Sequence, residues 1–258
     1  MDDRLEHTDT PPPNTHTNED EETASRAGLP AIDPQLLSRP SMIGKKIGDC
    51  TIKQVIGSGG MGTVYEAMQE QPHRRVALKM IKRGITSPSA LRRFDFEIQL
   101  LGRLRHPGIA QIYEAGTYDD GAEDGGVPYF VMEYIPSAKT ITEYTKEKQL
   151  STRERLTLFA SVCNAVQHGH LKGVVHRDLK PGNILVDSMG QARIIDFGVA
   201  RSTDSDLAVT TLGTSIGQLI GTLQYMSPEQ CDPDPSDIDT RSDLYSLGMI
   251  LYELLTGK

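Results

Sequence analysis

Tryptophan is absent from the chain, cysteine is scarce and no long apolar run occurs. The 258 residues include three cysteines and 5% aromatic residues. Cys50, Cys163 and Cys231 show no paired spacing, and no basic and then apolar segment opens the chain, so neither a disulfide framework nor a secretory signal is expected. No uninterrupted apolar run reaches the length that spans a bilayer. We therefore expect a cytoplasmic protein with no membrane segment in this chain, and any anchor would lie beyond its C-terminus.

Basic residues are also fewer than acidic residues. Lysine and arginine number 27 against 35 aspartates and glutamates, which gives a formal net charge of −8 and a pI near 5.4. A chain without a broad cationic field does not attract nucleic acid at long range, so we expect no nucleic-acid partner. A local phosphate-binding site is still compatible with this net negative charge. With 37% hydrophobic residues, the chain can bury a sizeable core and form more than one lobe.

Residues 1–42 are poor in apolar residues and rich in Asp, Glu, Thr and Pro. They include the run Pro11–Pro13 and the acidic cluster Glu19–Glu22. Such a segment cannot bury enough apolar area to offset its ordering entropy. We predict a disordered acidic tail.

From Ile43 the sequence changes to short β-branched runs broken by glycine. Ile52–Ile56 and Thr63–Ala67 are expected to be strands that flank Gly57–Gly62. Glycines at these positions would let backbone N–H groups approach a polyphosphate. Dinucleotide-binding folds have a similar pattern, but they place a helix directly after the glycines. Here a strand follows, which favours a glycine-rich hairpin that covers a nucleotide.

Arg75–Ile81 is expected to be a third strand, which places the ammonium of Lys79 in an apolar setting. A lysine in such a place is unusual unless it is paired. We expect the partner to be Glu97, on a helix over Pro88–Leu104. The alternative is a surface lysine and an ordinary helical glutamate. Two further strands, Ile109–Ala115 and Tyr129–Tyr134, complete a five-stranded sheet with one helix.

The segment Val174–Val186 places an acid, an ammonium and an amide between two short β-branched runs. Asp178 could accept a proton from a hydroxyl, Lys180 could neutralise a phosphoryl oxygen, and Asn183 could hold a divalent cation. The alternative is a solvated polar turn between two strands.

The eight residues from His176 to Asn183, His-Arg-Asp-Leu-Lys-Pro-Gly-Asn, resemble the catalytic loop of the eukaryotic-like (Hanks-type) serine/threonine protein kinases. The resemblance runs from about Ile47 to the end of the chain, and the motif sequences are most similar to those of the bacterial branch of the family. It implies an α+β, bilobal protein-kinase-like fold. Residues 43–134 would form an N-lobe with a five-stranded sheet and one helix, and residues 135–258 a mainly helical C-lobe.

In the second half, Ser151–Glu154 has the form of a capping box that opens a helix, and Gly173 ends it. Cys163 and His170 fall on the apolar stripe of this helix. We interpret both as packed core residues rather than as ligands.

A further helix is expected from Asp239, with apolar residues nearly all round it. The resemblance implies that Asp243 accepts backbone N–H bonds from the catalytic loop. The family continues past Lys258 with helices that cover this one and supply an Arg partner for Glu229. We therefore expect an incomplete C-lobe, apolar exposure over Leu247–Leu255 and a Glu229 without its counter-ion.

The resemblance also implies the residues of the site. ATP would be the phosphoryl donor, with Mg²⁺ as its metal and Mn²⁺ as the alternative. Asp178 would be the base, Lys79 and Glu97 would place the phosphates, and Thr222 would bond Asp178 and Lys180. The metal would be held by Asn183 and Asp196. The nucleotide would be bound by Ile56, Gly57, Ser58, Gly59, Gly60, Met61, Gly62, Val64, Ala77, Lys79, Met132, Glu133, Ile135 and Leu185.

A Ser- and Thr-rich segment between Asp196 and Glu229 is longer than a compact connection needs, which favours a functional loop. A phosphate on Thr210, Thr211 or Thr214, added by self-phosphorylation, could pair with Arg177 and order this loop.

Phosphoryl transfer from ATP to protein Ser or Thr hydroxyls in signalling is the function that these motifs favour. Two alternatives stay open at this point. One is a truncated, catalytically impaired nucleotide-binding or scaffolding module. The other is a small-molecule phosphotransferase, which would not need the segment from Gly221 to Glu229 that resembles the substrate-docking stretch of the family.

Overall fold

The computed structural model describes residues 42–59, 62–81, 98–99, 101–119, 121, 126–197, 223–231 and 238–258. Only Met42 of the acidic tail predicted over residues 1–42 is among them, so the disorder of that tail stays a prediction. Within the described ranges, no helix is both long and apolar enough to cross a bilayer.

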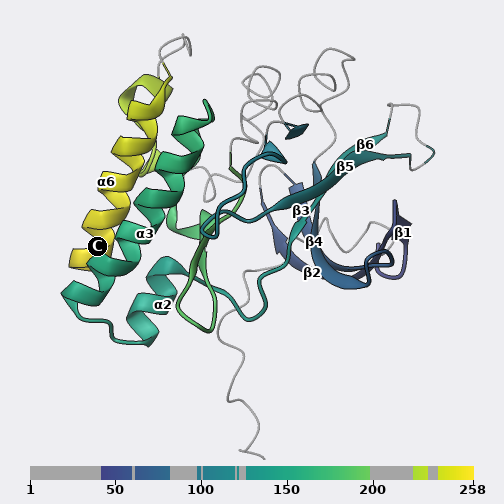
Figure 1. Cartoon of the computed structure of the whole chain (residues 1–258), viewed down its shortest axis with the longest axis horizontal. Coiled ribbons are helices and arrows are strands. Elements are labelled where there is room, and N and C mark those ends of the chain that lie inside the picture. Colours follow the sequence, from purple (N-terminus) through teal and green to yellow (C-terminus); the bar gives the residue numbers. More distant parts are fainter. Residues whose placement is uncertain are drawn as a thin grey trace, which may run out of the picture. The chain divides into compact units, whose positions relative to one another are not determined.

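The first half of the described chain forms one antiparallel sheet of six strands (Figure 1). Its strands run in the order β1-β2-β3-β4-β6-β5. The five strands expected from the sequence are present, with bounds shifted by up to three residues. The sixth, β1, has two residues, too few for a sequence period to be detected. The strands are β1 (Lys46–Ile47), β2 (Cys50–Ser58), β3 (Gly62–Gln69), β4 (Arg74–Ile81), β5 (Ile112–Tyr118) and β6 (Val127–Glu133).

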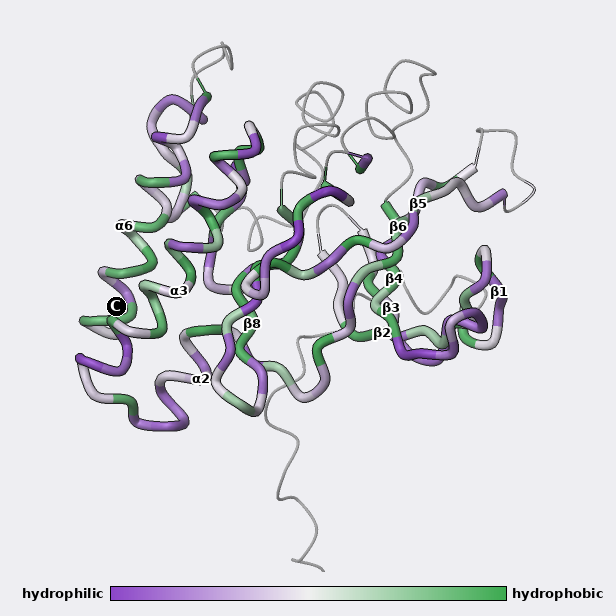
Figure 2. The backbone as a smooth tube through the Cα atoms, viewed as in Figure 1, coloured by the Kyte–Doolittle hydropathy of each residue, from purple (hydrophilic) through white to green (hydrophobic). Residues whose placement is uncertain are grey.

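The alternation of side chains along β4 divides the core of this sheet between its two faces. Val76 and Leu78 are fully buried in a small cluster on one face. Ala77 and Ile81 belong to a larger cluster that continues into the helical half. Lys79 shares the parity of Ala77 and Ile81, so the strand period alone directs its ammonium toward the second half of the chain. Figure 2 shows the hydrophobic residues gathered along β4 and β6.

Three α-helices and a small sheet lie in the described part of the second half. Each helix begins at a side-chain cap, and both Ser151 with Glu154 and Thr140 with Glu143 form capping boxes. The box at Ser151 confirms the helix start predicted there. The short β7 (Lys139–Thr140), β8 (Ile184–Val186) and β9 (Ala192–Ile194) pair in the order β7-β8-β9. The helices are α2 (Ile141–Glu147), α3 (Thr152–Leu171) and α6 (Thr240–Thr256).

Helix α6 is buried on one face only, which corrects two expectations drawn from its apolar sequence. Leu247 and Leu254, expected to be exposed, are 5% and 2% exposed because α6 packs against α3. Leu244 and Tyr252, on a helix expected to be buried all round, are 59% and 54% exposed. Leu255, at 43%, is exposed as expected. A sequence that is apolar all round does not tell which face the neighbouring helix covers.

Candidate active site

The loop between α3 and β8 brings an acid, an ammonium and an amide together. Lys180 Nζ lies 3.1 and 2.8 Å from the two carboxylate oxygens of Asp178. Asn183 Nδ2 donates to the Asp178 backbone carbonyl at 2.7 Å and to its Oδ2 at 3.1 Å. Arg177 turns the chain with a φ of 69°, and a short 3-10 helix over Pro181–Asn183 brings the amide back toward Asp178. The three side chains therefore lie together, as the sequence predicts.

A buried carboxylate from α6 holds the start of this loop. Asp243 accepts hydrogen bonds at 2.8 Å from the backbone N–H groups of His176 and Arg177. Its Oδ2 also lies 2.7 Å from Nε2 of His170 on α3. Burial alone would disfavour the charged carboxylate, but the hydrogen bonds from His170 and from the backbone outweigh it, and the pKa of Asp243 is lowered. The expected role of Asp243 is therefore present in the structure.

His176 is fully buried and connects two loops. Its Nδ1 accepts from the backbone N–H of Asp178 at 3.3 Å. Because Nδ1 is thus the acceptor, we assign the ring proton to Nε2, which donates to the carbonyl of Ile195 at 3.1 Å. The ring also contacts that of Phe197, with centroids 5.0 Å apart. The base candidate Asp178 and the segment that precedes Asp196 are therefore held by the same imidazole.

Asp196 faces Lys79 across the two halves of the site. Lys79 Nζ donates to Asp196 Oδ2 at 2.5 Å, and the two side chains are 6% and 17% exposed. The backbone N–H of Ile195 donates to the carbonyl of Asn183 at 3.0 Å, so Asn183 and Asp196 come from adjacent backbone. Asp196 adopts a φ of 57°. Its Oδ1 is buried and has no hydrogen-bond partner among the described residues.

The ion pair with Asp196 bears out the expectation that Lys79 is buried and paired, and it excludes a surface lysine. The partner proposed for it, Glu97, lies outside the described residues. So do other residues of the predicted site and loop, whose placement is therefore not described: Gly60, Met61, Gly198, Thr210, Thr211, Thr214 and Thr222.

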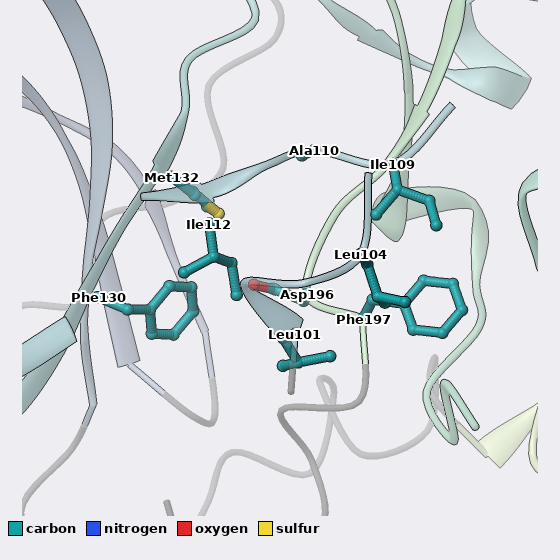
Figure 3. Close-up of a pocket in the computed structure, with 9 residues that line it drawn as sticks. All are labelled: Leu101, Leu104, Ile109, Ala110, Ile112, Phe130, Met132, Asp196 and Phe197. Carbon is teal, nitrogen blue, oxygen red and sulfur yellow. The ribbon is translucent and has the colours of Figure 1, made fainter. Parts of the chain in front are cut away.

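A small cavity borders Asp196. Figure 3 shows its carboxylate among apolar side chains, which include Ile112, Phe130 and Met132. The cavity holds about 10 Å³, which is space for at most one water molecule. It is therefore a packing defect behind Met132 and not a site for a nucleotide.

The glycine-rich segment is a hairpin between β2 and β3. Gly59 N–H donates to the carbonyl of Gly62 at 2.9 Å. A Cβ on Gly62 would lie 2.1 Å from the backbone oxygen of Met80, so no other residue fits there without movement. Since strand β3 follows the glycines directly, the structure confirms the hairpin and excludes the strand-to-helix turn of a dinucleotide fold.

The predicted nucleotide-binding residues come from both sheets. Val64 on β3 packs against the cluster that contains Ala77 and Met132. Leu185 is half-buried on β8, in the second sheet. Other described members are Ile56, Gly57 and Ser58 on β2, Glu133 at the end of β6, and Ile135 two residues after it.

The chain leaves β6 through a segment that we call the hinge, residues 133–138. Glu133 N–H donates to the carbonyl of Gln111 at 2.9 Å. A glutamate oxygen of Glu133 accepts from the Gln111 N–H at 3.3 Å in return. Ser137 adopts a φ of 53°. The backbone at Ser137 is therefore in the left-handed conformation that glycine favours, and this conformation is strained for a residue with a side chain.

Residues 223–231 are bound to the loop that carries Asp178 and to α6. Gln230 Nε2 donates to the carbonyl of Arg177 at 2.6 Å, and its Oε1 accepts from the Ser227 hydroxyl and backbone N–H at 3.1 Å. Ser242 donates its hydroxyl to Glu229 at 2.6 Å. This bond lowers the pKa of Glu229. Glu229, expected to lack its arginine counter-ion, therefore has a hydroxyl partner in the structure.

Sequence reasoning missed two residues of this arrangement, His170 and Gln230. His170 was assigned to the core because it lies on an apolar stripe, but it binds Asp243. The signal available was its position one helical turn before the loop, where a polar side chain on a buried face needs a partner. Gln230 carried no signal, because its partners come from a distant segment.

A sequence model described as the protein kinase domain matches residues 50–258. The serine/threonine-protein kinase PknB of Mycobacterium leprae is 37% identical over 205 residues, which cover 79% of this chain and 32% of that protein. PknB of Mycobacterium tuberculosis is 37% identical over 209 residues, which cover 80% and 32%. The chain thus spans about a third of the length of these relatives.

A solved structure shows the same fold. The crystal structure of the Mycobacterium tuberculosis PknI kinase domain matches with a TM-score of 0.64 and 24% sequence identity. The match covers 85% of this chain and 78% of that one. The α+β fold class predicted from the sequence is confirmed.

Proposed function

Because the chain belongs to the protein kinase domain family, we propose that it transfers the γ-phosphoryl group of ATP to Ser or Thr hydroxyls of proteins. The observation that carries this proposal is the grouping of Asp178, Lys180 and Asn183, linked through Ile195 to the Lys79–Asp196 pair. The nucleotide would lie between residues 43–134 and residues 135–258, the two lobes that we propose. Since ATP is the donor, we place the reaction in the cytoplasm.

The chemistry of the donor set fits Mg²⁺. Asp196 Oδ1 is a buried carboxylate oxygen without a partner among the described residues, and such an atom is costly to leave unpaired. Asn183 Nδ2 is engaged with Asp178, which leaves the amide oxygen as the atom for a hard cation. We therefore propose Asp196 and Asn183 as the ligands of Mg²⁺, or of Mn²⁺ in its place. When bound, the metal would neutralise charge on the outer phosphates.

The side chains of the chain itself would position and polarise the reactants. Lys79, held in place by Asp196 and by the proposed partner Glu97, would bind the α- and β-phosphates. Asp178 would accept a hydrogen bond from the substrate hydroxyl and take its proton, and Lys180 would offset charge on the transferred group. Because the transition state is loose, positioning and electrostatics supply most of the rate. Thr222 would join Asp178 and Lys180 and favour Ser or Thr acceptors.

The remaining assignments follow from the same proposal. The glycine-rich hairpin and the apolar residues around Val64, Ala77, Met132 and Leu185 would hold the nucleotide. Backbone groups of Glu133 and Ile135 would bind the adenine edge. Self-phosphorylation at Thr210, Thr211 or Thr214 would order the loop through Arg177. Phosphopeptide mapping of the active protein tests this last point, since an active protein with an unmodified loop contradicts it.

Separate measurement of binding and transfer tests the main proposal. Mg-ATP binding is followed by a thermal-shift titration, and transfer by ³²P incorporation from γ-labelled ATP into a generic basic protein. Asp178→Asn is expected to lose most of the transfer and to keep Mg-ATP binding, because Asp178 contacts the acceptor and not the nucleotide. Asp49→Asn, at an exposed turn before β2, is the matched control and is expected to keep both.

Three outcomes would overturn the proposal. In the first, the wild-type protein binds Mg-ATP and transfers nothing, which is the behaviour of a non-catalytic module. In the second, transfer goes to small alcohols and not to protein. In the third, Asp178→Asn loses binding and transfer equally, which would remove Asp178 from the assigned role.

A further inference from the structure

A second concavity lies behind the hinge and shares no residue with the glycine-rich hairpin or with the catalytic loop. It is an open cleft of about 590 Å³. Four segments that are separate in sequence line it: the start of β4, the connection from residue 102 into β5, the end of β6, and β9. Its charged and aromatic lining residues are Arg74, Arg105, His106, Tyr113, Glu133 and Arg193. We call it the basic groove.

The groove is cationic in a chain whose net charge is −8. Among the described lining residues, three are arginines and one is a glutamate, and Glu133 Oε1 lies 3.6 Å from Nε of Arg193. Burial, together with the neighbouring His168, lowers the pKa of His106. Because its Nδ1 also accepts the backbone N–H of Gly108 at 3.0 Å, His106 adds no charge at neutral pH. The excess positive charge therefore comes from arginine and persists through the physiological pH range.

Arg74 is held in position before any ligand arrives. Its Nε donates to Gln69 Oε1 at 2.7 Å, and Gln69 is buried. Its guanidinium carbon lies 3.5 Å from the centroid of the Tyr113 ring. Such stacking and bonding reduce the side-chain entropy that an arginine loses when it binds an anion. The single bond to Gln69 uses one of five N–H donors and leaves the fork capable of binding a carboxylate.

The shape of the site selects an extended ligand. Residues 111–113, where β5 begins, line the groove, and β5 is the edge strand of the six-stranded sheet. Edge strands are templates for extended peptides, whose alternate side chains then reach the pockets beside the edge. We propose that the basic groove binds an extended peptide segment that carries clustered carboxylates. This inference does not rest on the proposed phosphoryl transfer.

Fluorescence polarisation with a fluorescein-labelled octaglutamate peptide tests the proposal on the full chain at low salt. Saturable binding is expected, and it is expected to weaken as NaCl is raised from 50 to 300 mM because exposed ion pairs are screened. A Gly/Ser peptide of the same length carries no charge and is expected not to bind.

Charge-matched variants locate the site. Arg74→Gln with Arg105→Gln is expected to weaken binding at least fivefold. Lys148→Gln with Arg153→Gln removes the same two charges at exposed positions outside the groove and is expected to change affinity less than twofold. Peptide affinity is compared at a temperature at which thermal unfolding shows both doubly substituted proteins to be folded. A loss of affinity through unfolding is thereby separated from a loss of contacts.

Several outcomes overturn the proposal. One is the absence of saturable binding, and another is equal affinity for the neutral peptide. A third is equal loss in the two charge-matched variants, which would mean that only net charge matters. A fourth is complete displacement of the peptide by inorganic phosphate at low millimolar concentration, which would reveal a site for a small anion and not for a peptide.

Discussion

Replacement of Asp243 by asparagine removes the anchor of the catalytic loop while the volume of the side chain is kept. The carboxylate accepts hydrogen bonds from His170 Nε2 and from the backbone N–H groups of His176 and Arg177. An amide offers one oxygen and one NH₂ group. With its oxygen at the place of Oδ2, the amide still accepts from His170 and His176, but its NH₂ group then faces the N–H of Arg177. That donor lies where water does not reach it, because Asp243 is 1% exposed. The substitution therefore leaves at least one buried donor unsatisfied.

The magnitude follows from the kind of bond that is lost. Removing one member of a buried, charged hydrogen-bonding arrangement costs about 3–5 kcal/mol. Against a total stability of about 5–15 kcal/mol, this is a large fraction. With an m value of about 3 kcal/mol/M, the urea midpoint of Asp243→Asn is expected to fall by about 1–2 M.

Equilibrium urea unfolding followed by far-UV circular dichroism measures this change. Asp239→Asn is the matched control, since it makes the same chemical change four residues earlier, at the N-cap of α6. Asparagine and aspartate are equally good N-caps, so its midpoint is expected to stay within error of the wild type. Equal midpoints for Asp243→Asn and Asp239→Asn would refute the assigned role of the buried carboxylate.

The same carboxylate predicts an acid limb in the stability of the protein. Its pKa is lowered in the folded state, whereas an unfolded aspartate titrates near about pH 3.9. The unfolded chain therefore binds this proton first as the pH falls. The stabilisation is fully present above the unfolded pKa and is lost as the pH falls toward the lowered folded value. Urea midpoints between pH 3 and pH 6 are expected to fall less steeply for Asp243→Asn than for the wild type, and equal slopes would contradict this.

Two further predictions concern packing. A Cβ on Gly169 would lie 2.2 Å from Phe197 Cζ, whereas one on Gly248 of α6 would have no neighbour within 4 Å. Gly169→Ala is therefore expected to lower the urea midpoint, and Gly248→Ala to raise stability by about 0.5–1 kcal/mol through helix propensity; a gain in both would show that Phe197 does not pack there. Burial raises the pKa of Cys50 to about 11, whereas Cys231 is exposed. Mass spectrometry after treatment with a thiol reagent at pH 8 is expected to find Cys231 modified and Cys50 spared until the protein unfolds, because only about 0.1% of the Cys50 thiol is ionised at that pH; rapid labelling of native Cys50 would contradict its burial.

Features that depend on a few neighbouring residues were predictable. The capping box at Ser151, the glycine hairpin before β3 and the strand that carries Lys79 each have a short-range signal, either a cap, a turn residue or a period of two. The grouping of Asp178 with Asn183 was predictable for the same reason, since five residues separate them. Helix α2 and strand β1 were not predicted, because seven and two residues carry too little periodicity.

Features that depend on packing between distant segments were not predictable. Lys79 and Asp196 are 117 residues apart in sequence, and no spacing rule indicates that they form an ion pair. The sequence places His170 on the apolar face of α3, and only the packing of α6 shows that Asp243 lies beside it. The basic groove gave no signal, because Arg74, Arg105 and Arg193 come from three separate segments.

The sequence by itself determined the strands, the helix caps and the order of polar residues in the catalytic loop, since these follow from interactions within a few residues along the chain. Only the tertiary structure decided which charges meet, which face of α6 is covered and where the arginines gather. Those outcomes depend on which elements pack against one another. Packing brings together residues that are close in space, and the distance between two residues along the chain says almost nothing about how close they are in space.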